Sequence, residues 1–279
     1  MITQSQDSAV TVKHLAVVTG GARGIGEAVV RKFAGAGYAV AILDVNRAKG
    51  EALAADLGGW DRSTRFYECD VADADIVAAV ADHVERDLGR ASVLVTSAAL
   101  IPNSESIMDM DLAAHDRMWR VNYHGTLHAC RSFGKHMIAG GGGAIVSVGS
   151  INCILPLPLP AYNPGKVALA RLMQLLAAEL GRHGVRVNSV APTYVMTPEL
   201  QARIDSGQRD LGKIMEVHAL NRLPVPADVA EAIAFLCSPG ARTITGVLLP
   251  VDSGWGVGVS YMTYAGGVPW EKEDRTLLK

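Results

Sequence analysis

The sequence predicts an α/β fold in which a doubly wound parallel sheet of about seven strands carries helices on both faces. Short runs rich in apolar residues are typical of strands that are buried on both sides, and the predicted strands lie at 15–19, 39–43, 65–69, 93–96, 144–148, 185–190 and 247–251. Segments with helical spacing of apolar residues alternate with these runs, at 24–36, around 53–57, and at 73–88, 123–139, 161–182 and 227–237. Strands separated by helices favour a parallel sheet.

Composition narrows the class of protein. The 279 residues carry a net charge of −2 without a long run of one sign, which argues against a nucleic-acid or anionic-membrane partner. We find neither a basic-then-apolar leader nor an apolar run of the roughly 18 residues that a membrane span needs. The four cysteines are far apart, so we expect free thiols in a cytoplasmic protein and no metal site.

We expect a single domain over 1–279 with three peripheral parts. Residues 1–12 are polar and mixed, as in a flexible N-terminus. Residues 193–218 mix charges, Met and Gly after a strand and read as an irregular substrate lid. The C-terminal extension 256–279 is longer than the fold needs, and the aromatic residues near it suggest that it docks on something: Trp255, Tyr261, Tyr264 and Trp270.

A glycine-rich turn, TGGARGIG at 19–26, stands between the first strand and the first helix. Glycines allow close approach to a pyrophosphate, and a helix N-terminus offers free N–H groups. A plain tight turn explains many such matches, but this one lies at the carboxyl end of a strand, where nucleotides bind in open parallel sheets. We expect dinucleotide contacts from Gly20, Arg23, Gly24, Ile25 and Gly26.

Asp44, at the end of the second strand, predicts the choice of dinucleotide. A carboxylate there accepts hydrogen bonds from the ribose hydroxyls of NAD and repels the 2′-phosphate of NADP. Arg23 points the other way, because a base in the glycine-rich turn suits a 2′-phosphate. No base directly follows Asp44, so the carboxylate decides in favour of NAD.

Tyr162 and Lys166 form a YxxxK spacing at the start of a long helix, so both side chains lie on one face. A tyrosine acting as a base near neutrality needs its pKa lowered from about 10, and a neighbouring ammonium, together with oxidised nicotinamide, supplies charge of the right sign. Ser150 ends an earlier strand and is placed to bind a substrate oxygen. Each element alone is common by chance, and their joint order makes the chemistry specific.

In these motifs the chain resembles the short-chain dehydrogenase/reductase family over about Lys13 to Trp255. The resemblance implies a Rossmann-type sheet and an NAD-dependent alcohol dehydrogenase or ketoreductase, usually a homotetramer built through its long helices. It implies the catalytic set Asn122, Ser150, Tyr162 and Lys166, with Asn122 holding a water in a proton relay. Further cofactor contacts would come from Asp70, Val71, Ala98, Tyr162, Lys166, Pro192, Val195 and Thr197.

The chain departs from the family pattern in several places. Thr96-Ser97-Ala98-Ala99 replaces the usual Asn-Asn-Ala-Gly, and Thr193 follows Pro192 where glycine is usual. Pro164-Gly165 lies between Tyr162 and Lys166, which requires the helix to begin close to Tyr162. The interval from Ser150 to Tyr162 is one residue shorter than usual, and the loop 156–160 is expected to absorb the difference.

The sequence allows two classes of substrate: a cyclic or aryl alcohol, or a sugar or polyol. Ser150, Asn152, Tyr162 and Tyr194 are the expected substrate contacts, beside an apolar wall at 154–160. An NADP-linked carbonyl reductase and a non-catalytic NAD-sensing scaffold on the same fold are the alternatives. His124 and His128 share a helical spacing with metal ligands, but lack a third ligand nearby, so packing or an interface is the better interpretation.

Overall fold

Seven parallel strands form a single sheet in the order β3-β2-β1-β4-β5-β6-β7. The computed structural model describes residues 14–58, 63–101 and 104–269. The strands are β1 Leu15–Thr19, β2 Ala39–Asp44, β3 Thr64–Glu68, β4 Ala91–Thr96, β5 Gly143–Val148, β6 Val185–Pro192 and β7 Leu248–Val251. All seven predicted strands are present, with bounds within two residues of the prediction, which confirms the predicted fold class.

The strand order reverses at β1. The chain first builds outward through β2 and β3, then returns to place β4 on the other side of β1, where Thr19 lies beside Leu43 on one flank and Thr96 on the other. Loops that leave β1 and β4 therefore diverge at their carboxyl ends. Open α/β sheets bind ligands at such a switch point.

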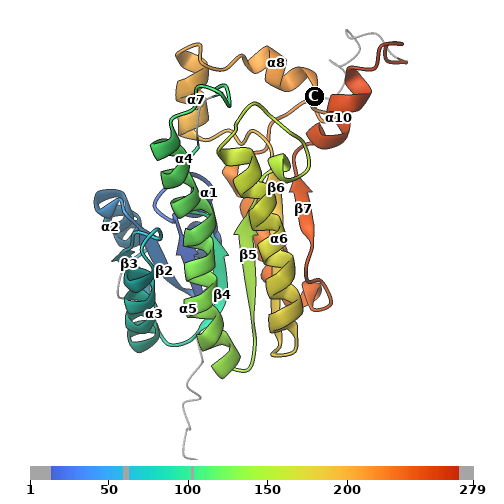
Figure 1. The fold of residues 1–279 in the computed structure, drawn as a ribbon. Helices are drawn as coiled ribbons and strands as arrows, with labels where there is room; N and C mark the ends of the chain where they lie inside the picture. The colour runs from blue at the N-terminus through green and yellow to red at the C-terminus, as the bar shows by residue number, and fades with distance from the viewer. Residues whose placement is uncertain (1–13, 59–62, 102–103, 270–279) are drawn as a thin grey trace, which may run out of the picture.

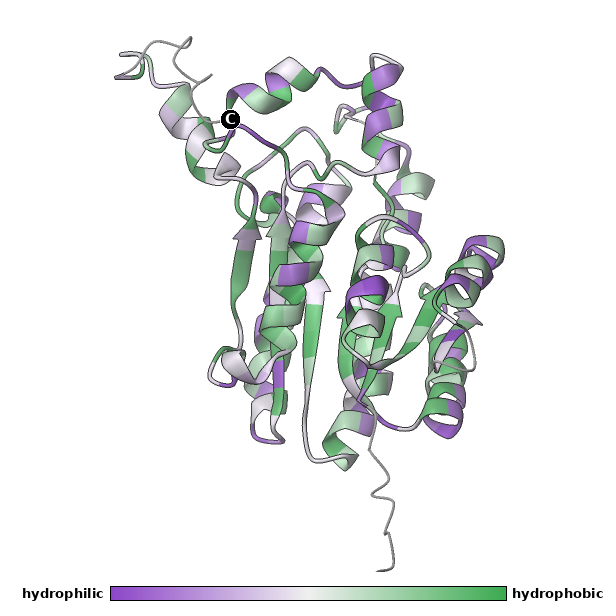
Figure 2. Ribbon diagram, turned by 180° about the vertical axis from the view of Figure 1, so that it is seen from behind, coloured by the Kyte–Doolittle hydropathy of each residue, from purple (hydrophilic) through white to green (hydrophobic). Residues whose placement is uncertain are grey.

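Helices cover both faces of the sheet (Figure 1). On one face lie α3 Ala74–Leu88, α5 Gly125–Ala139 and α6 Tyr162–Gly181; on the other lie α1 Gly24–Gly35, α2 Arg47–Asp56 and α9 Pro226–Cys237. The strands supply both cores by alternation, since Leu15 and Val17 belong to the first core and Ala16 and Val18 to the second. Figure 2 shows the resulting hydrophobic strands between helices of mixed character.

The helix predicted over 123–139 is longer than the periodicity indicates. It begins as α4 Leu112–Trp119, passes through the wide π-helical turn η2 Arg120–His124 and continues as α5. Asp111 caps the start by accepting a hydrogen bond from the Ala113 N–H at 2.9 Å. α4 has few buried apolar side chains, so no hydrophobic stripe marked it in the sequence.

The prediction of an irregular segment over 193–218 is wrong. It contains α7 Pro198–Asp205 and α8 Leu211–Glu216, which lie above the carboxyl ends of the strands (Figure 1). Thr197 and Asp210 cap the two helices, and Pro198 occupies a first helical position. A small separate core stabilises the segment, formed by Leu200, Ile214 and Leu223 with Tyr194, Met196, Ile204 and Met215 packed around them.

The described part of the C-terminal extension is also partly helical. α10 Trp255–Met262 follows β7, and the Asp252 carboxylate accepts hydrogen bonds from the N–H groups of Gly254 and Gly256. Trp255 is buried, whereas Tyr261 and Tyr264 are exposed. Trp270 and the expected flexible N-terminus over 1–12 lie outside the described residues.

The cysteines agree with the expectation of free thiols. Cys69 and Cys130 are buried, Cys153 and Cys237 are partly buried, and all four are unpaired in the part of the chain that the structure describes. Within 14–58, 63–101 and 104–269, no helix is both long and apolar enough to cross a membrane. The short helices η3 Ile151–Cys153 and η4 Pro239–Ala241 complete the fold.

Candidate active site

A single groove of about 1720 Å³ runs along the carboxyl ends of the strands. It brings together nearly all the residues that the sequence predicted for the site: Gly20, Arg23, Gly24, Ile25, Asp44, Asp70, Val71, Ala98, Ser150, Asn152, Tyr162, Lys166, Pro192, Tyr194, Val195 and Thr197. Two predicted residues, Gly26 and Asn122, are not part of its lining. The volume exceeds that of a typical small-ligand pocket, so the groove has room for a dinucleotide and a substrate.

The glycine-rich turn packs so closely that two of its glycines have no space for a side chain. A Cβ at Gly20, whose φ is +65°, would lie 2.6 Å from Ala98 Cα, and a Cβ at Gly26 would lie 2.0 Å from Gly20 O. Gly24 differs, since with φ +58° its position meets only a Thr197 methyl at 3.7 Å. Gly20 and Gly26 therefore shape the turn, while Gly24 leaves the groove open.

Asp44 is tied to the same turn. One carboxylate oxygen accepts a hydrogen bond from the backbone N–H of Ala22 at 3.1 Å, and the other from that of Asn46 at 2.9 Å. These contacts hold the half-buried carboxylate at the edge of the groove, beside the N-terminus of α1. The position suits a group that accepts hydrogen bonds from ribose hydroxyls.

Tyr162 is the first residue of α6, as Pro164 requires, and Lys166 follows one turn later. Lys166 is 3% exposed and donates a hydrogen bond to Val148 O at 2.7 Å, with its Nζ 5.4 Å from the centre of the Tyr162 ring. Ser150 lies just beyond β5, and its hydroxyl accepts a hydrogen bond from the Asn152 N–H at 3.2 Å. Hydroxyl, phenol and ammonium thus share one wall of the groove.

The short interval between Ser150 and Tyr162 is accommodated by η3 and the loop that follows it. Asn163 fixes the end of this loop, because its backbone N–H donates to Leu159 O at 2.8 Å and its side-chain amide donates to Leu157 O at 3.1 Å. The loop therefore enters α6 in a defined conformation, and Leu157 and Leu159 remain in the lining of the groove.

Burial dominates the electrostatics of this wall. Burial raises the pKa of Tyr162 to about 12, although a hydrogen bond with Ser150 works in the lowering direction. Burial also lowers the pKa of Lys166 to about 8. The lowered tyrosine pKa that a base needs is thus absent from the protein alone. Desolvation outweighs the hydrogen bond with Ser150, and the Lys166 ammonium donates its own hydrogen bond to Val148 O.

Asn122 lies in the π-helical turn and fixes the loop after β4. Its Oδ1 accepts a hydrogen bond from the Leu100 N–H at 2.8 Å, and its Nδ2 donates to Leu100 O at 3.0 Å. Its own backbone carbonyl accepts a bond from the Thr126 hydroxyl at 3.1 Å. The side-chain amide is therefore engaged by the backbone that borders the groove, and the expected proton relay stays a prediction.

Orphaned polar atoms test whether the groove fits a nicotinamide dinucleotide. Thr193 Oγ1 and Asn152 Oδ1 are buried, and neither has a hydrogen-bond partner within the described residues. Both residues belong to the lining. Together with the open backbone at Gly24 and the acceptor at Asp44, they fit a polar ligand that extends from the turn toward Ser150.

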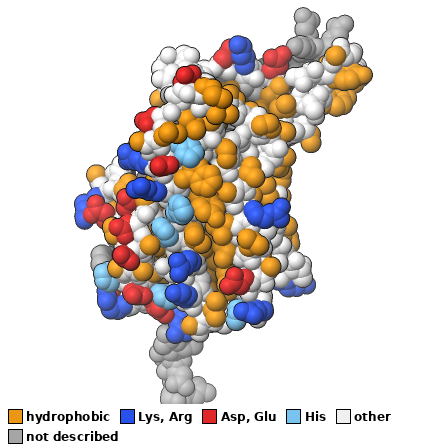
Figure 3. All heavy atoms as spheres, viewed as in Figure 1, with side chains coloured by type: hydrophobic (Ala, Val, Ile, Leu, Met, Phe, Trp, Pro, Cys, Tyr) orange, Lys and Arg blue, Asp and Glu red, His pale blue; other side chains and the backbone are white. Residues whose placement is uncertain are grey.

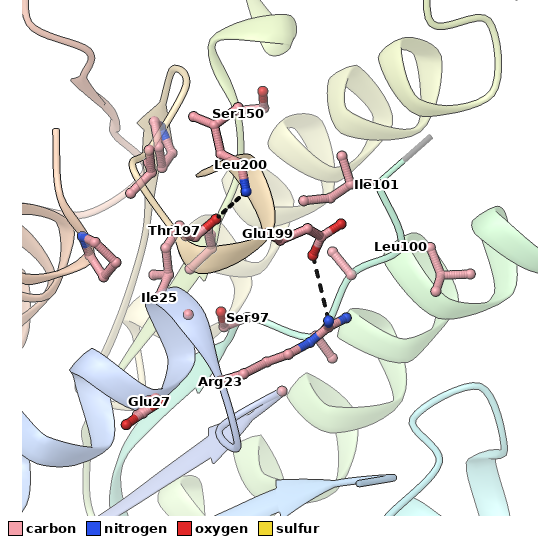
Figure 4. A pocket seen from close by; sticks show the side chains of 18 of the residues that line it. Arg23, Ile25, Glu27, Ser97, Leu100, Ile101, Ser150, Thr197, Glu199 and Leu200 are labelled. Carbon is pink, nitrogen blue, oxygen red and sulfur yellow. Dashed lines mark hydrogen bonds and ion pairs between the residues drawn. The ribbon is translucent and has the colours of Figure 1, made fainter. Parts of the chain in front are cut away.

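The sequence did not indicate the ion pair that crosses the groove. Glu199 on α7 faces Arg23 of the glycine-rich turn, with 3.5 Å between Arg23 Nη1 and Glu199 Oε2 (Figure 4). Thr197 caps α7 beside it by accepting from the Leu200 N–H at 3.2 Å. The Thr-Pro-Glu order at 197–199 is a helix-start pattern that would have placed Glu199 on a first turn.

His128 is partly buried, whereas His124 is exposed. Their rings stack with centroids 6.2 Å apart, and a His128 ring nitrogen lies 3.0 Å from Val71 O. These contacts agree with the packing interpretation.

Comparisons with known proteins agree with this geometry. A family model described as "Enoyl-(Acyl carrier protein) reductase" matches residues 20–256. The chain is 36% identical over 260 residues to D-threitol dehydrogenase of Mycolicibacterium smegmatis, covering 91% of this chain and 99% of that protein. It is 38% identical over 245 residues to galactitol 2-dehydrogenase of Rhizobium johnstonii, covering 86% and 94%.

A solved structure shows the same fold. It is an oxidoreductase of the short-chain dehydrogenase/reductase family from Burkholderia thailandensis, with a TM-score of 0.83 and 33% identity, covering 92% of this chain and 99% of that one. The named relatives act on alcohols, so the activity is that of an alcohol/ketone oxidoreductase. With its seven-stranded parallel sheet and its serine, tyrosine and lysine on one wall, the chain belongs to the short-chain dehydrogenase/reductase family.

Proposed function

We propose that the protein is an NAD-dependent dehydrogenase that interconverts a secondary alcohol and a ketone, with Tyr162 as the acid/base. The observation that supports this best is the single groove shared by Asp44 at one end and by Ser150, Tyr162 and Lys166 on the catalytic wall. Gly20, Arg23, Gly24, Ile25, Asp70, Val71, Ala98, Pro192, Val195 and Thr197 would hold the dinucleotide. Bound NAD supplies the hydride acceptor.

The residues of the wall divide the work on the substrate hydroxyl. Tyr162, as phenolate, takes the hydroxyl proton while the carbinol carbon loses its hydride, and a carbonyl forms. Ser150 donates a hydrogen bond to the same oxygen and stabilises its developing charge. The positive charges of Lys166 and of oxidised nicotinamide oppose the desolvation that raises the pKa of Tyr162.

NAD is proposed over NADP because the Asp44 carboxylate stands at the edge of the groove and its position is fixed by the turn. A 2′-phosphate beside it would meet like charge. An NADP-linked carbonyl reductase is the second candidate, favoured by the cationic side chain of Arg23 in the same turn.

The substrate is proposed to be a polyol or a cyclic secondary alcohol. Apolar side chains of Leu157, Leu159 and Leu200 line the groove beside the polar Asn152 and Tyr194, which suits a ring or a carbon chain that carries hydroxyls. Two relatives are named for the polyols threitol and galactitol. We propose that 193–218, now seen as α7 and α8, closes over this end as a lid.

We also propose a homotetramer in a reducing cytoplasm. Figure 3 shows hydrophobic side chains gathered in a band over α5 and α6. On α6, Val167 and Leu175 are 50% and 61% exposed, although Leu169 and Met173 on its other side are buried. A helix that is apolar on both sides suits burial against a second subunit.

The test is formation of NADH from NAD, or of NADPH from NADP, with a panel of polyols, cyclic alcohols and hydroxy acids. We expect turnover with NAD, and a loss of about 10²–10⁴-fold in kcat for Tyr162→Phe, as for removal of an acid/base group. Tyr67→Phe is the matched control, since that hydroxyl contacts Asp87 outside the groove. Near-normal turnover by a folded Tyr162→Phe protein would refute the assignment.

A further inference from the structure

The ion pair between Arg23 and Glu199 joins the two sides of the groove (Figure 4). Arg23 is the N-cap residue of α1, and its side chain is 61% exposed without making a capping bond. Its guanidinium extends toward the first turn of α7, where the Glu199 side chain is 41% exposed. The base in the glycine-rich turn is therefore directed at a carboxylate from another element.

Glu199 is itself held in place. Its Oε1 accepts a hydrogen bond from Arg203 Nη2 at 3.1 Å, and the same nitrogen donates to Ile101 O at 3.2 Å. Arg203 is 19% exposed, so this second guanidinium is well packed. Contacts from α7 and from the loop after β4 thus fix the carboxylate that faces Arg23.

Arg23 belongs to the turn that contacts Asp44, at the end of the groove where the adenine ribose is expected. It directly follows Ala22, whose backbone N–H binds Asp44. Among the described residues, however, Arg23 makes its ion pair with Glu199 and none with Asp44. Asp44 thus has no ion pair with the base of the glycine-rich turn, and the Arg23 guanidinium, which would favour a 2′-phosphate, is paired with Glu199 instead.

We infer that Glu199 is a positioning residue for cofactor choice: by pairing with Arg23, it withholds the guanidinium from the 2′-phosphate of NADP. This rests on the proposed preference for NAD. A guanidinium freed from Glu199 can turn toward the ribose end and pair with phosphate, which arginine binds well. Glu199 and Asp44 then both disfavour NADP. Asp44 repels the 2′-phosphate, and Glu199 pairs with the Arg23 guanidinium that would otherwise bind it.

The test is binding, measured by isothermal titration calorimetry of NAD and NADP with the wild type, Glu199→Gln, Arg23→Ala and the double variant. For Glu199→Gln we expect affinity for NADP to rise up to about fivefold, the upper range for an exposed ion pair, with little change for NAD. In the Arg23→Ala background the same change should have no effect. The gain should also shrink at high salt, because exposed charges are screened.

Glu231→Gln is the control, because it removes a comparable exposed pair, with Lys32, outside the groove. It should leave both affinities unchanged. An unchanged NADP/NAD affinity ratio in Glu199→Gln, or an equal rise when Arg23 is absent, would overturn the inference. A wild type that binds NADP more tightly than NAD would instead overturn the proposed cofactor, which keeps the two failures distinct.

Discussion

Replacing Lys166 by methionine should change how stability depends on pH. Lys166 is 3% exposed, and burial lowers its pKa from 10.5 to about 8. A lysine whose folded-state pKa lies below its unfolded value binds fewer protons when folded. It therefore destabilises the fold at pH values below its folded pKa, and this penalty fades as the pH rises toward the unfolded pKa.

The size of the effect follows from the two pKa values. The linkage relation gives a penalty of about 3 kcal/mol near pH 7 and about 1 kcal/mol near pH 9.5. Lys166→Met removes this penalty and also the hydrogen bond to Val148 O, a loss that changes little between the two pH values. The difference in unfolding free energy, variant minus wild type, should thus fall by about 2 kcal/mol over this range.

Urea unfolding followed by circular dichroism, without cofactor and at one protein concentration, measures the difference. Lys135→Met is the control, because the exposed Lys135 is hydrated in both states and its substitution should shift stability equally at both pH values. A Lys166→Met curve that runs parallel to the wild type across this pH range would refute the reasoning. Loss of dehydrogenase activity in the same variant is expected but does not test it.

Two further predictions concern the cofactor end of the groove. Asp44→Asn keeps an acceptor for Ala22 but removes the charge, so the preference for NAD over NADP should fall by about tenfold in calorimetric titrations; an unchanged preference would remove Asp44 from the explanation. Gly26→Ala brings a Cβ to 2.0 Å from Gly20 O and should cost about 1–3 kcal/mol in urea unfolding. Gly35→Ala, whose Cβ meets nothing within 4 Å, is its control, and equal stability of the two variants would contradict the packing of the turn.

The parts of the fold that the sequence predicted are those set by local pattern. Strands buried on both faces appear as apolar runs, and the turn at 19–26 needs glycine at fixed places. α7 and α8 were missed because their stability comes from caps and a small core assembled from distant positions, such as Leu200 with Leu223. Their hydrophobic spacing alone is weak.

The sequence predicted which residues form the site but not the contacts that they make. Motif order placed Ser150, Tyr162 and Lys166 together, yet only the fold shows that Lys166 bonds to Val148 O. Glu199 escaped prediction because it lies far from Arg23 in sequence, and no spacing rule links them. Desolvation at Tyr162 depends on what surrounds the phenol, which the YxxxK spacing does not state.

The π-helical turn at 120–124 determines which way the side chains of α5 point around the helix axis. Such a turn amounts to one surplus residue within an α-helix, and each residue of an α-helix advances the side chains by about 100°. A single deletion in this turn would let α4 and α5 merge into a regular helix. It would also rotate Asn122 out of register with the Leu100 backbone or force the buried face of α5, with Phe133, out of the core. The chain is thus far less tolerant of length changes here than of substitutions.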